Sequence, residues 1–245
     1  RQAAERAASF VRATLWREAD ATLLRRYRDG EAAIDAYAED YAALIWGLLE
    51  LLQATGDAGW LEWAITLQRR QDELFWDDDD GGWFSTTGSD PTVLLRLKED
   101  HDGAEPSASS ISAMNCLTLA HLTGLDEYRQ RAGRTIGRFG PRVGAAGRVV
   151  PMLLCALAQW HAPNMQVVIT GAGSVGARPL EAAVAARYLP FAIRLQVGPA
   201  TADRLGRLLP FVAAMDPETP AVYVCRDFVC RQPVHSADDL QAALA

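Results

Sequence analysis

Hydrophobic residues in the first two thirds of the chain recur with the period of amphipathic helices. The clearest pattern, spaced i, i+4, i+7, is carried by Tyr37, Tyr41, Leu44, Leu48 and Leu51. It predicts a helix that ends at Thr55-Gly56, where glycine supplies a left-handed cap. Similar patterns predict helices over 60–75, 105–123, 126–139 and 141–160. Residues 1–162 are therefore expected to be almost entirely helical.

The helical part also repeats. Five positions recur 68 residues further along: Leu51, Thr55, Gly56, Trp60 and Ala64 return as Leu119, Thr123, Gly124, Tyr128 and Ala132. The opening R-Q-x-A-x-R recurs 128 residues later, so one helical hairpin is present about three times. Repeated hairpins predict a solenoid or a closed α/α toroid, and a period near 68 favours the toroid. Three hairpins are half of a six-hairpin ring, and the chain begins with Arg1 and not with Met, so we expect a fragment of a longer protein.

The sequence pattern changes near residue 163. Beyond it, β-rich runs alternate with helical runs in the order 166–170, 178–188, 191–197, 221–225 and 237–244. This order is typical of a small α/β unit with a partly parallel sheet. The predicted fold class is therefore mainly α. It is the second half of a six-hairpin-type α/α toroid (1–162) followed by a small α/β appendage (163–245).

Composition narrows the classes of function. The chain of 245 residues has a net charge of −7, which argues against a nucleic-acid partner. Its apolar runs are shorter than a membrane-spanning helix needs, and its amphipathic start lacks the apolar core of a signal peptide. Four scattered cysteines favour a reducing cytoplasm. Four scattered histidines have no metal-ligand spacing, so neither a metal nor a cofactor is expected.

The densest chemistry lies in the segment K-E-D-H-D-G-A-E-P-S (98–107), directly before a predicted helix. Its acids Asp100, Asp102 and Glu105 fall at the same end of a hairpin as Asp40 does one repeat earlier. Carboxylates in such places either cap helices and face solvent or gather around a pocket. Two carboxylates across a pocket suit glycosidic-bond chemistry, one as acid and one as base or nucleophile. These four acids are the candidate catalytic residues.

Two further side chains are candidate substrate contacts. Trp83, in the loop D-G-G-W-F-S-T-T, either stacks on a sugar ring or belongs to the core. Lys98, the only lysine beside 23 arginines, opens the acid-rich segment. The turn Asp77–Asp80 is expected to be solvated, with calcium binding as the alternative although EF-hand spacing is absent. Six arginines and no acid between 128 and 148 predict a solvated face or an anion-binding patch.

Two short motifs lie in the predicted α/β part. Gly171–Gly176 spells G-A-G-S-V-G after a strand, as dinucleotide-binding loops do. The acid expected after the next strand is missing, so a flexible glycine loop is the favoured interpretation. Cys225 and Cys230, each followed by an arginine, are candidate redox residues if their sulfurs can bridge. Two half-buried thiols are the alternative.

Five longer motifs occur in an order that resembles one protein family: Y-A-E-D-Y-A, L-L-x-A-T-G-D-x-x-W-L-E-W-A, Q-D-E-L-F-W-D-x-x-x-G-G-W-F-S-T, K-E-D-x-D-G-A-E-P-S and A-x-Y-V-C-R-D-F-V-C. The chain is similar to the C-terminal part of the family that includes the spermatogenesis-associated thioredoxin-like proteins. The resemblance implies a toroid similar to N-acylglucosamine 2-epimerases and six-hairpin glycosidases. It also implies a thioredoxin-like domain before Arg1, as a partner within the same chain. The family motifs match all the candidate residues: Asp40, Trp83, Lys98, Asp100, Asp102, Glu105, Cys225 and Cys230.

Two hypotheses of function follow. The first is a toroid that binds or processes carbohydrate in a pocket lined with carboxylates, epimerase-like or hydrolase-like if it is an enzyme. The second is a non-catalytic scaffold for the thioredoxin-like domain. Acids paired to arginines, with no open cavity beside them, would favour the second.

Overall fold

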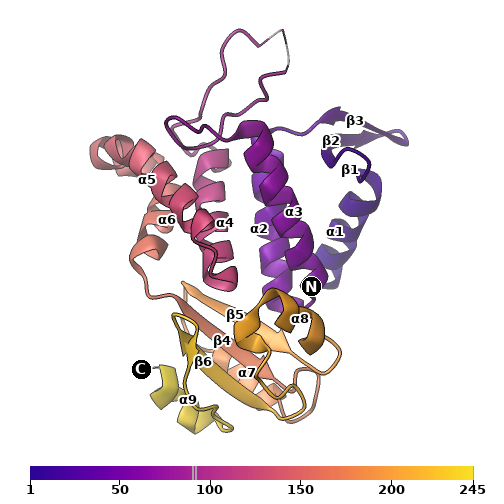
Figure 1. Cartoon of the computed structure of the whole chain (residues 1–245), viewed down its shortest axis with the longest axis vertical. Helices are drawn as coiled ribbons and strands as arrows, with labels where there is room; N and C mark the ends of the chain where they lie inside the picture. Colours follow the sequence, from indigo (N-terminus) through magenta and orange to yellow (C-terminus); the bar gives the residue numbers. More distant parts are fainter. Residues whose placement is uncertain (90, 92, 245) are drawn as a thin grey trace.

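The computed structural model describes residues 1–89, 91 and 93–244, and in this part the protein is mainly α-helical (Figure 1). The first two thirds hold α1 (Gln2–Thr14), α2 (Ala38–Thr55), α3 (Ala58–Phe75), α4 (Ala108–Thr123), α5 (Asp126–Ala146) and α6 (Pro151–His161). They also hold the strands β1 (Trp16–Arg17), β2 (Thr22–Arg28) and β3 (Glu31–Asp35). The last third holds β4 (Met165–Thr170), α7 (Arg178–Ala185), β5 (Ala192–Val197), α8 (Ala202–Leu208), β6 (Ala221–Arg226), β7 (Val229–Cys230) and α9 (Ala237–Leu244). Two short 3-10 helices lie at Gly147–Val149 and Pro210–Val212.

The helices form two repeated hairpins offset by 68 residues, α2–α3 and α4–α5, where the sequence predicted about three. α3 packs on α2 and α5 packs on α4, while α2, α4 and α6 lie side by side. Gly56 and Gly124 end the first helix of each hairpin with φ of 68° and 73°, the left-handed caps expected from sequence. The preceding threonines also match, since Thr55 and Thr123 each donate from Oγ1 to the carbonyl four residues back at 2.7 Å. The repeat therefore extends to individual hydrogen bonds.

Residues 16–35 correct the expectation of an almost wholly helical region. They form an antiparallel sheet in the order β1-β2-β3. The turn between β2 and β3 is Asp29-Gly30, with φ of 53° and 85°, and Asp-Gly is a strong two-residue hairpin signal. Leu23 is 2% exposed, and its N–H donates to the Tyr41 hydroxyl at 3.1 Å. The sheet thus packs on α2 through tertiary contacts, which a search for helical periodicity does not detect.

Helix boundaries around Pro141 also differ from the prediction. α5 continues through Pro141 to Ala146, and α6 begins at Pro151 instead of Pro141. Proline inside a helix forgoes one hydrogen bond, a cost that α5 tolerates on its outer, solvent-facing turns. At residue 151 proline occupies the first helical turn, where its missing N–H costs nothing.

The C-terminal third forms a four-stranded sheet of order β5-β4-β6-β7, in which β4 and β5 run parallel across α7. One sheet face, including Val168, Leu195 and Cys225, belongs to the same buried core as the helices. The other face, including Val167 and Ile169, packs against α7 and α9 in a separate core. The predicted boundary at 162/163 therefore marks a change of secondary structure, while one core continues across it. Helix α8 and strand β7 were not predicted.

No single helix within the described residues is long and apolar enough to cross a membrane. The bent pair Asp126–Val149 and Pro151–His161 meets the criterion together, by length and composition alone.

Candidate functional site

The predicted rim acids lie at the end of the helical layer opposite the α/β unit, where long segments lead into α2 and α4 (Figure 1). Asp40 stands in the first turn of α2. Its Oδ2 accepts a hydrogen bond from the Tyr37 N–H at 2.8 Å and lies 3.6 Å from the Arg25 Nε. Asp40 therefore stabilises the start of α2 and pairs with a cation from β2.

Asp102 joins two helix N-termini. Its Oδ1 accepts from the Ser107 N–H at 3.0 Å before α4, and its Oδ2 accepts from the Met152 N–H at 2.8 Å in α6. A carboxylate suits this position, because unpaired N–H groups and the helix dipoles both attract negative charge. Asp102 therefore has a structural role, because both of its oxygens accept hydrogen bonds from backbone N–H groups.

The other two acids of the segment are exposed. Asp100 forms an ion pair with Arg142 of α5, and the Arg142 Nε also donates to the Asp100 carbonyl at 3.2 Å. The Glu105 side chain faces solvent and makes no hydrogen bond within the described residues. The four acids share one end of the layer, as expected, but three of them are engaged in caps or ion pairs. Asp100 lines a cavity of about 430 Å³ beside α5, together with Lys98 and Arg142, and the other three acids do not line it.

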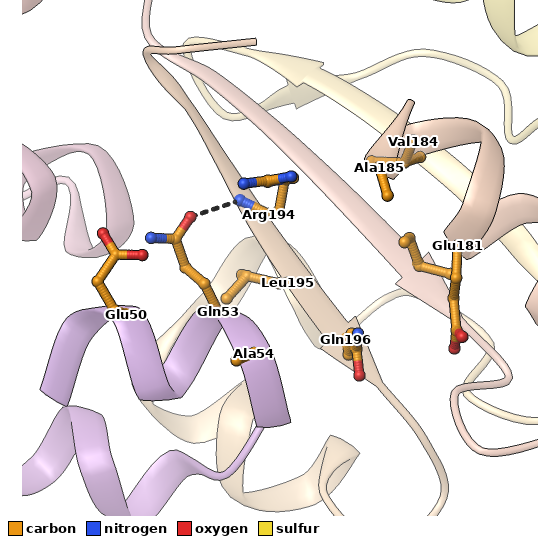
Figure 2. A pocket seen from close by; sticks show the side chains of 10 residues that line it. Glu50, Gln53, Ala54, Glu181, Val184, Ala185, Arg194, Leu195 and Gln196 are labelled. Carbon is orange, nitrogen blue, oxygen red and sulfur yellow. Dashed lines mark hydrogen bonds between the residues drawn. The ribbon is translucent and has the colours of Figure 1, made fainter. Parts of the chain in front are cut away.

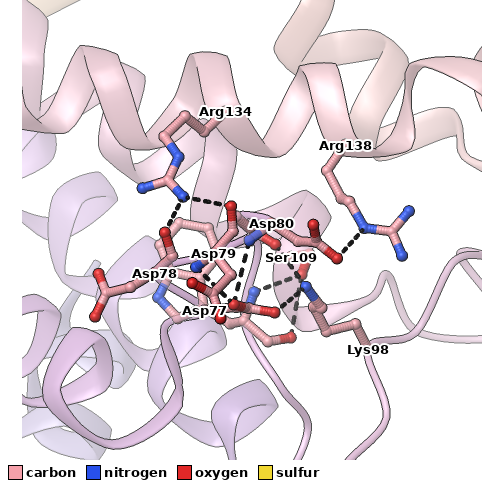
Figure 3. Close-up of polar contacts among 10 residues, drawn as sticks. Asp77, Asp78, Asp79, Asp80, Lys98, Ser109, Arg134 and Arg138 are labelled. Atoms are coloured by element: carbon pink, nitrogen blue, oxygen red, sulfur yellow. Dashed lines mark hydrogen bonds and ion pairs between the residues drawn. The ribbon is translucent and has the colours of Figure 1, made fainter.

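The Lys98 ammonium group binds the acidic turn 77–80, and the residue also lines the cavity beside Asp100. Its Nζ contacts the Asp77 Oδ2 at 2.6 Å and the Gly81 carbonyl at 2.8 Å, and its side chain is 8% exposed (Figure 3). The pairing lowers the pKa of the Asp77 carboxyl. Arg134 donates to the carbonyls of Asp78 and Asp79, and Arg138 approaches Asp80 (Figure 3).

Arg134 and Arg138 of α5 therefore pair with the acidic turn of the same molecule. The sequence analysis had expected these arginines to face solvent or to bind an anion. No cluster of three or more potential metal ligands occurs in the part of the chain that the structure describes.

Trp83 belongs to the core. It is fully buried, its ring centroid lies 4.8 Å from that of Trp76, and its Nε1 donates to the Asp72 Oδ1 at 2.9 Å. Its ring has no free face for a ligand in this structure. The interpretation of Trp83 as core, one of the two alternatives, agrees with this placement.

Asp72 is a buried carboxylate that the sequence analysis missed. It lines a groove of about 380 Å³ between α3 and α5, with Arg131 paired to its Oδ2 at 3.2 Å. Burial raises the pKa of Asp72 to about 6 in spite of Arg131 and two hydrogen-bond donors. A signal was available, because Gln68, Gln71 and Asp72 interrupt the otherwise apolar buried stripe of α3.

We expect Asp72 to make stability depend on pH. The folded-state pKa lies above the ordinary carboxyl value, so the folded protein binds a proton more tightly, and this contribution is lost as pH rises from about 4 through 6. Relative to wild type, Asp72→Asn should gain about 2 kcal/mol in unfolding free energy between pH 4 and pH 7. Urea denaturation of both proteins at several pH values measures the difference. Burial lowers the pKa of His121 to about 4, so this histidine also titrates in the same range. Its contribution is the same in wild type and in Asp72→Asn and cancels in their difference. A difference that stays constant with pH would contradict the assignment.

A second groove lies where the helices meet the α/β unit. We call it the junction groove; its walls come from α2, α4, α6 and β5, with Trp46, Glu50, Gln53, Thr118, Gln159 and Arg194. An adjoining pocket that extends toward α7 shares Glu50, Gln53 and Arg194 with it. The Gln53 carboxamide oxygen accepts from the Arg194 N–H at 3.1 Å, with Glu50 beside it on α2 (Figure 2). Trp46 is 41% exposed. Gln159 is 4% exposed and lies in the wall of the groove.

The structure shows where the glycine-rich loop and the cysteine pair of the C-terminal third lie. The G-A-G-S-V-G loop connects β4 to α7 in a parallel strand–helix–strand unit, and Gly171 (φ 67°) lies so close to Pro220 that a Cβ would be 2.8 Å from its nitrogen. Cys225 and Cys230 stand opposite each other on β6 and β7 and form a disulfide. Two separate half-buried thiols, the other alternative from sequence, are thus not what the structure shows.

The fold and these contacts describe a mainly helical protein of repeated hairpins joined to an α/β unit. No family model matches the sequence. Over 212 residues the chain is 34% identical to spermatogenesis-associated protein 20 from human and from rat, covering 85% of this chain and 27% of each relative. An uncharacterized Caenorhabditis elegans protein is 31% identical over 214 residues, covering 86% and 29%. These homologues are consistent with the family that the motifs resemble, and the chain spans about a quarter of their length.

Proposed function

We propose that this chain is a section of an α/α toroid within a longer protein related to spermatogenesis-associated protein 20, and that the section acts as a non-catalytic scaffold. The alternation of adjacent helices (α2, α4, α6) with covering helices (α3, α5) supports the toroid. The homologues' greater length leaves room for the remaining hairpins and for the thioredoxin-like domain that the resemblance implies. A cytoplasmic location remains part of this proposal.

The observation that carries the scaffold proposal is the Asp102 carboxylate, which accepts one N–H at the start of α4 and one in α6. A catalytic acid or base needs an oxygen free to exchange a proton with a ligand. Both Asp102 oxygens instead hold backbone groups, and Asp40 and Asp100 are paired to arginines. These acids stabilise the end of the layer at which they lie.

A second candidate function is the binding of a small polar ligand such as a sugar, in the junction groove and not at the rim acids. Gln159 supports it, because its carboxamide lies in the wall of the groove, where it can donate to and accept from a ligand hydroxyl. The half-exposed Trp46 and the carboxylate of Glu50 supply the stacking face and the acceptor that sugar hydroxyls need.

One set of variants tests both candidates. We expect Asp102→Asn to lower the unfolding free energy by about 2 kcal/mol, because one of its two N–H partners then faces an amide donor. Glu105→Gln, an exposed change nearby, should alter it by less than about 0.5 kcal/mol. Under the scaffold proposal neither variant changes the titration of the protein with D-glucose or N-acetyl-D-glucosamine by calorimetry. Heat of binding that is lost in Glu105→Gln at unchanged stability would contradict the scaffold and restore the rim acids as catalytic candidates.

The same titration separates the second candidate from the scaffold. Binding that is present in wild type and in Glu105→Gln, but lost in Trp46→Ala, would place a sugar in the junction groove. The absence of binding in every protein would reject that candidate and leave the scaffold proposal standing.

A further inference from the structure

The β6–β7 hairpin closes on a turn that its residues do not favour. Asp227 and Phe228 connect the strands with φ of 49° and 64°. Two-residue hairpin turns of type I′ have positive φ at both positions and normally use Asn-Gly or Asp-Gly. A phenylalanine in this region costs on the order of 1 kcal/mol. One residue further out on each strand, Cys225 and Cys230 are joined by the disulfide, which holds the strands in register.

This turn docks the α/β unit on the helical layer. The Phe228 ring lies against Gly124, the cap of α4, where an added Cβ would be 3.4 Å from its Cζ. Its centroid is 5.6 Å from that of Phe211. The Asp227 N–H donates to the Asn164 carbonyl at 3.0 Å.

A cavity of about 310 Å³ lies beneath the turn and is lined by Asp227, Phe228, Arg129 and His121. His121 is 3% exposed, and its Nδ1 has no hydrogen-bond partner among the described residues. The unpaired Nδ1 of His121 therefore lies in a residue that lines the cavity beneath the turn Asp227-Phe228.

The two sulfurs differ in access. Cys225 is fully buried in the core shared with the helices, whereas Cys230 is partly exposed on the short edge strand β7. Thiol–disulfide exchange proceeds by attack of a thiolate on an accessible sulfur. The geometry therefore makes the Cys230 Sγ the point of attack and the Cys225 sulfur the leaving group.

We propose that the Cys225–Cys230 bridge is a thiol-exchange latch: a dithiol reduces it through Cys230, and reduction releases Phe228 from Gly124. One thiolate of the dithiol bonds to the Cys230 sulfur as the Cys225–Cys230 bond breaks, and Cys225 takes up a proton. The second thiol of the dithiol then attacks the mixed disulfide, is oxidised with the first to a disulfide, and leaves Cys230 as a thiol. In a reducing cytoplasm, which the sequence predicts for this protein, disulfides are usually transient in this way.

The test compares the wild-type chain with and without dithiothreitol under native conditions. Alkylation and mass spectrometry count the reactive thiols, and amide hydrogen exchange follows the turn 226–230 and the α4 cap at 124–126. We expect reduction to add the Cys225 and Cys230 thiols while far-ultraviolet circular dichroism is unchanged. Exchange at both segments should accelerate about tenfold or more, and exchange in β4 should not.

Two variants control the interpretation. Cys225→Ser/Cys230→Ser should show the fast exchange whether or not dithiothreitol is present. Cys155→Ser, which removes an exposed free cysteine, should respond as wild type does. Reduction that occurs only when the chain is unfolded, or that leaves exchange at 124–126 unchanged, would overturn the latch. The wild-type comparison decides the question even if the double variant fails to fold.

Discussion

Gly56→Ala is expected to lower the unfolding free energy by about 3 kcal/mol, which would be a large fraction of the stability of an ordinary domain. Gly56 has φ of 68°, and a Cβ at this position would lie 2.0 Å from the Gln196 carbonyl oxygen of β5. Left-handed backbone costs a non-glycine residue about 1 kcal/mol. The clash adds more, because the obstacle is strand backbone and not a flexible side chain. Urea denaturation followed by circular dichroism measures the loss.

Gly124→Ala is the matched control, since Gly124 is the equivalent cap one repeat later. Its φ is 73°, but an added Cβ would meet only the Phe228 ring at 3.4 Å, an ordinary contact distance. We expect a loss of about 1 kcal/mol from the backbone alone. Equal losses for the two variants would show that the close approach of α2 to β5 does not contribute.

Lys98→Met is expected to cost about 3 kcal/mol at neutral pH, because it leaves the Asp77 carboxylate without its cation in a site where the lysine is 8% and the aspartate 14% exposed. The lysine lowers the pKa of Asp77, so the pair stabilises the fold above the ordinary carboxyl pKa. That contribution is lost as pH falls through the folded-state value. The difference between wild type and variant should therefore shrink below about pH 4, which denaturation at acidic and neutral pH would detect.

Arg138→Met is the control on the same acidic turn. Arg138 lies 3.9 Å from Asp80, and their side chains are 45% and 67% exposed. An exposed pair of this kind contributes under about 0.5 kcal/mol. A loss as large as that of Lys98→Met would mean that general charge on the turn, and not the buried lysine, determines the effect.

Lys98 also shows why composition alone is a poor guide to a single residue. Its stem lies beside Gly82, whose added Cβ would be 3.5 Å from the Lys98 Cδ, and its ammonium group lies 5.0 Å from the Phe84 ring centroid. One compact ammonium reaches both the Asp77 carboxylate and the Gly81 carbonyl there. A planar guanidinium has a different shape and directs its donors as a fork. The narrow site accounts for a lysine in a chain whose other basic residues are arginine.

Elements whose formation depends on local periodicity and caps were predicted closely from sequence. Helix α2 ends at the predicted Thr55-Gly56, α4 begins after Ser107, and α9 spans the predicted 237–244. The β1–β3 sheet was missed because its burial depends on α2, as the contact of Leu23 with Tyr41 shows. The Asp29-Gly30 turn was the local signal that could have revealed it.

The sequence alone determined where the acids would lie. Carboxylates just before a helix belong at its N-terminus, and a repeat of 68 residues brings Asp40 and the segment 98–107 to the same end of the layer. The spacing of Cys225 and Cys230 left open whether the two sulfurs could bridge. The placement of the acids follows from hydrogen bonds and periodicities within a few turns of backbone.

Only the tertiary structure decided what those side chains touch. Asp102 accepts from two backbone N–H groups that are 45 positions apart, Trp83 donates to Asp72, and Lys98 pairs with Asp77. The register of β6 with β7 brings the two cysteine sulfurs into a bond. Each partner comes from another element and is selected by burial, because a charge or donor removed from water must find a complement wherever packing places one.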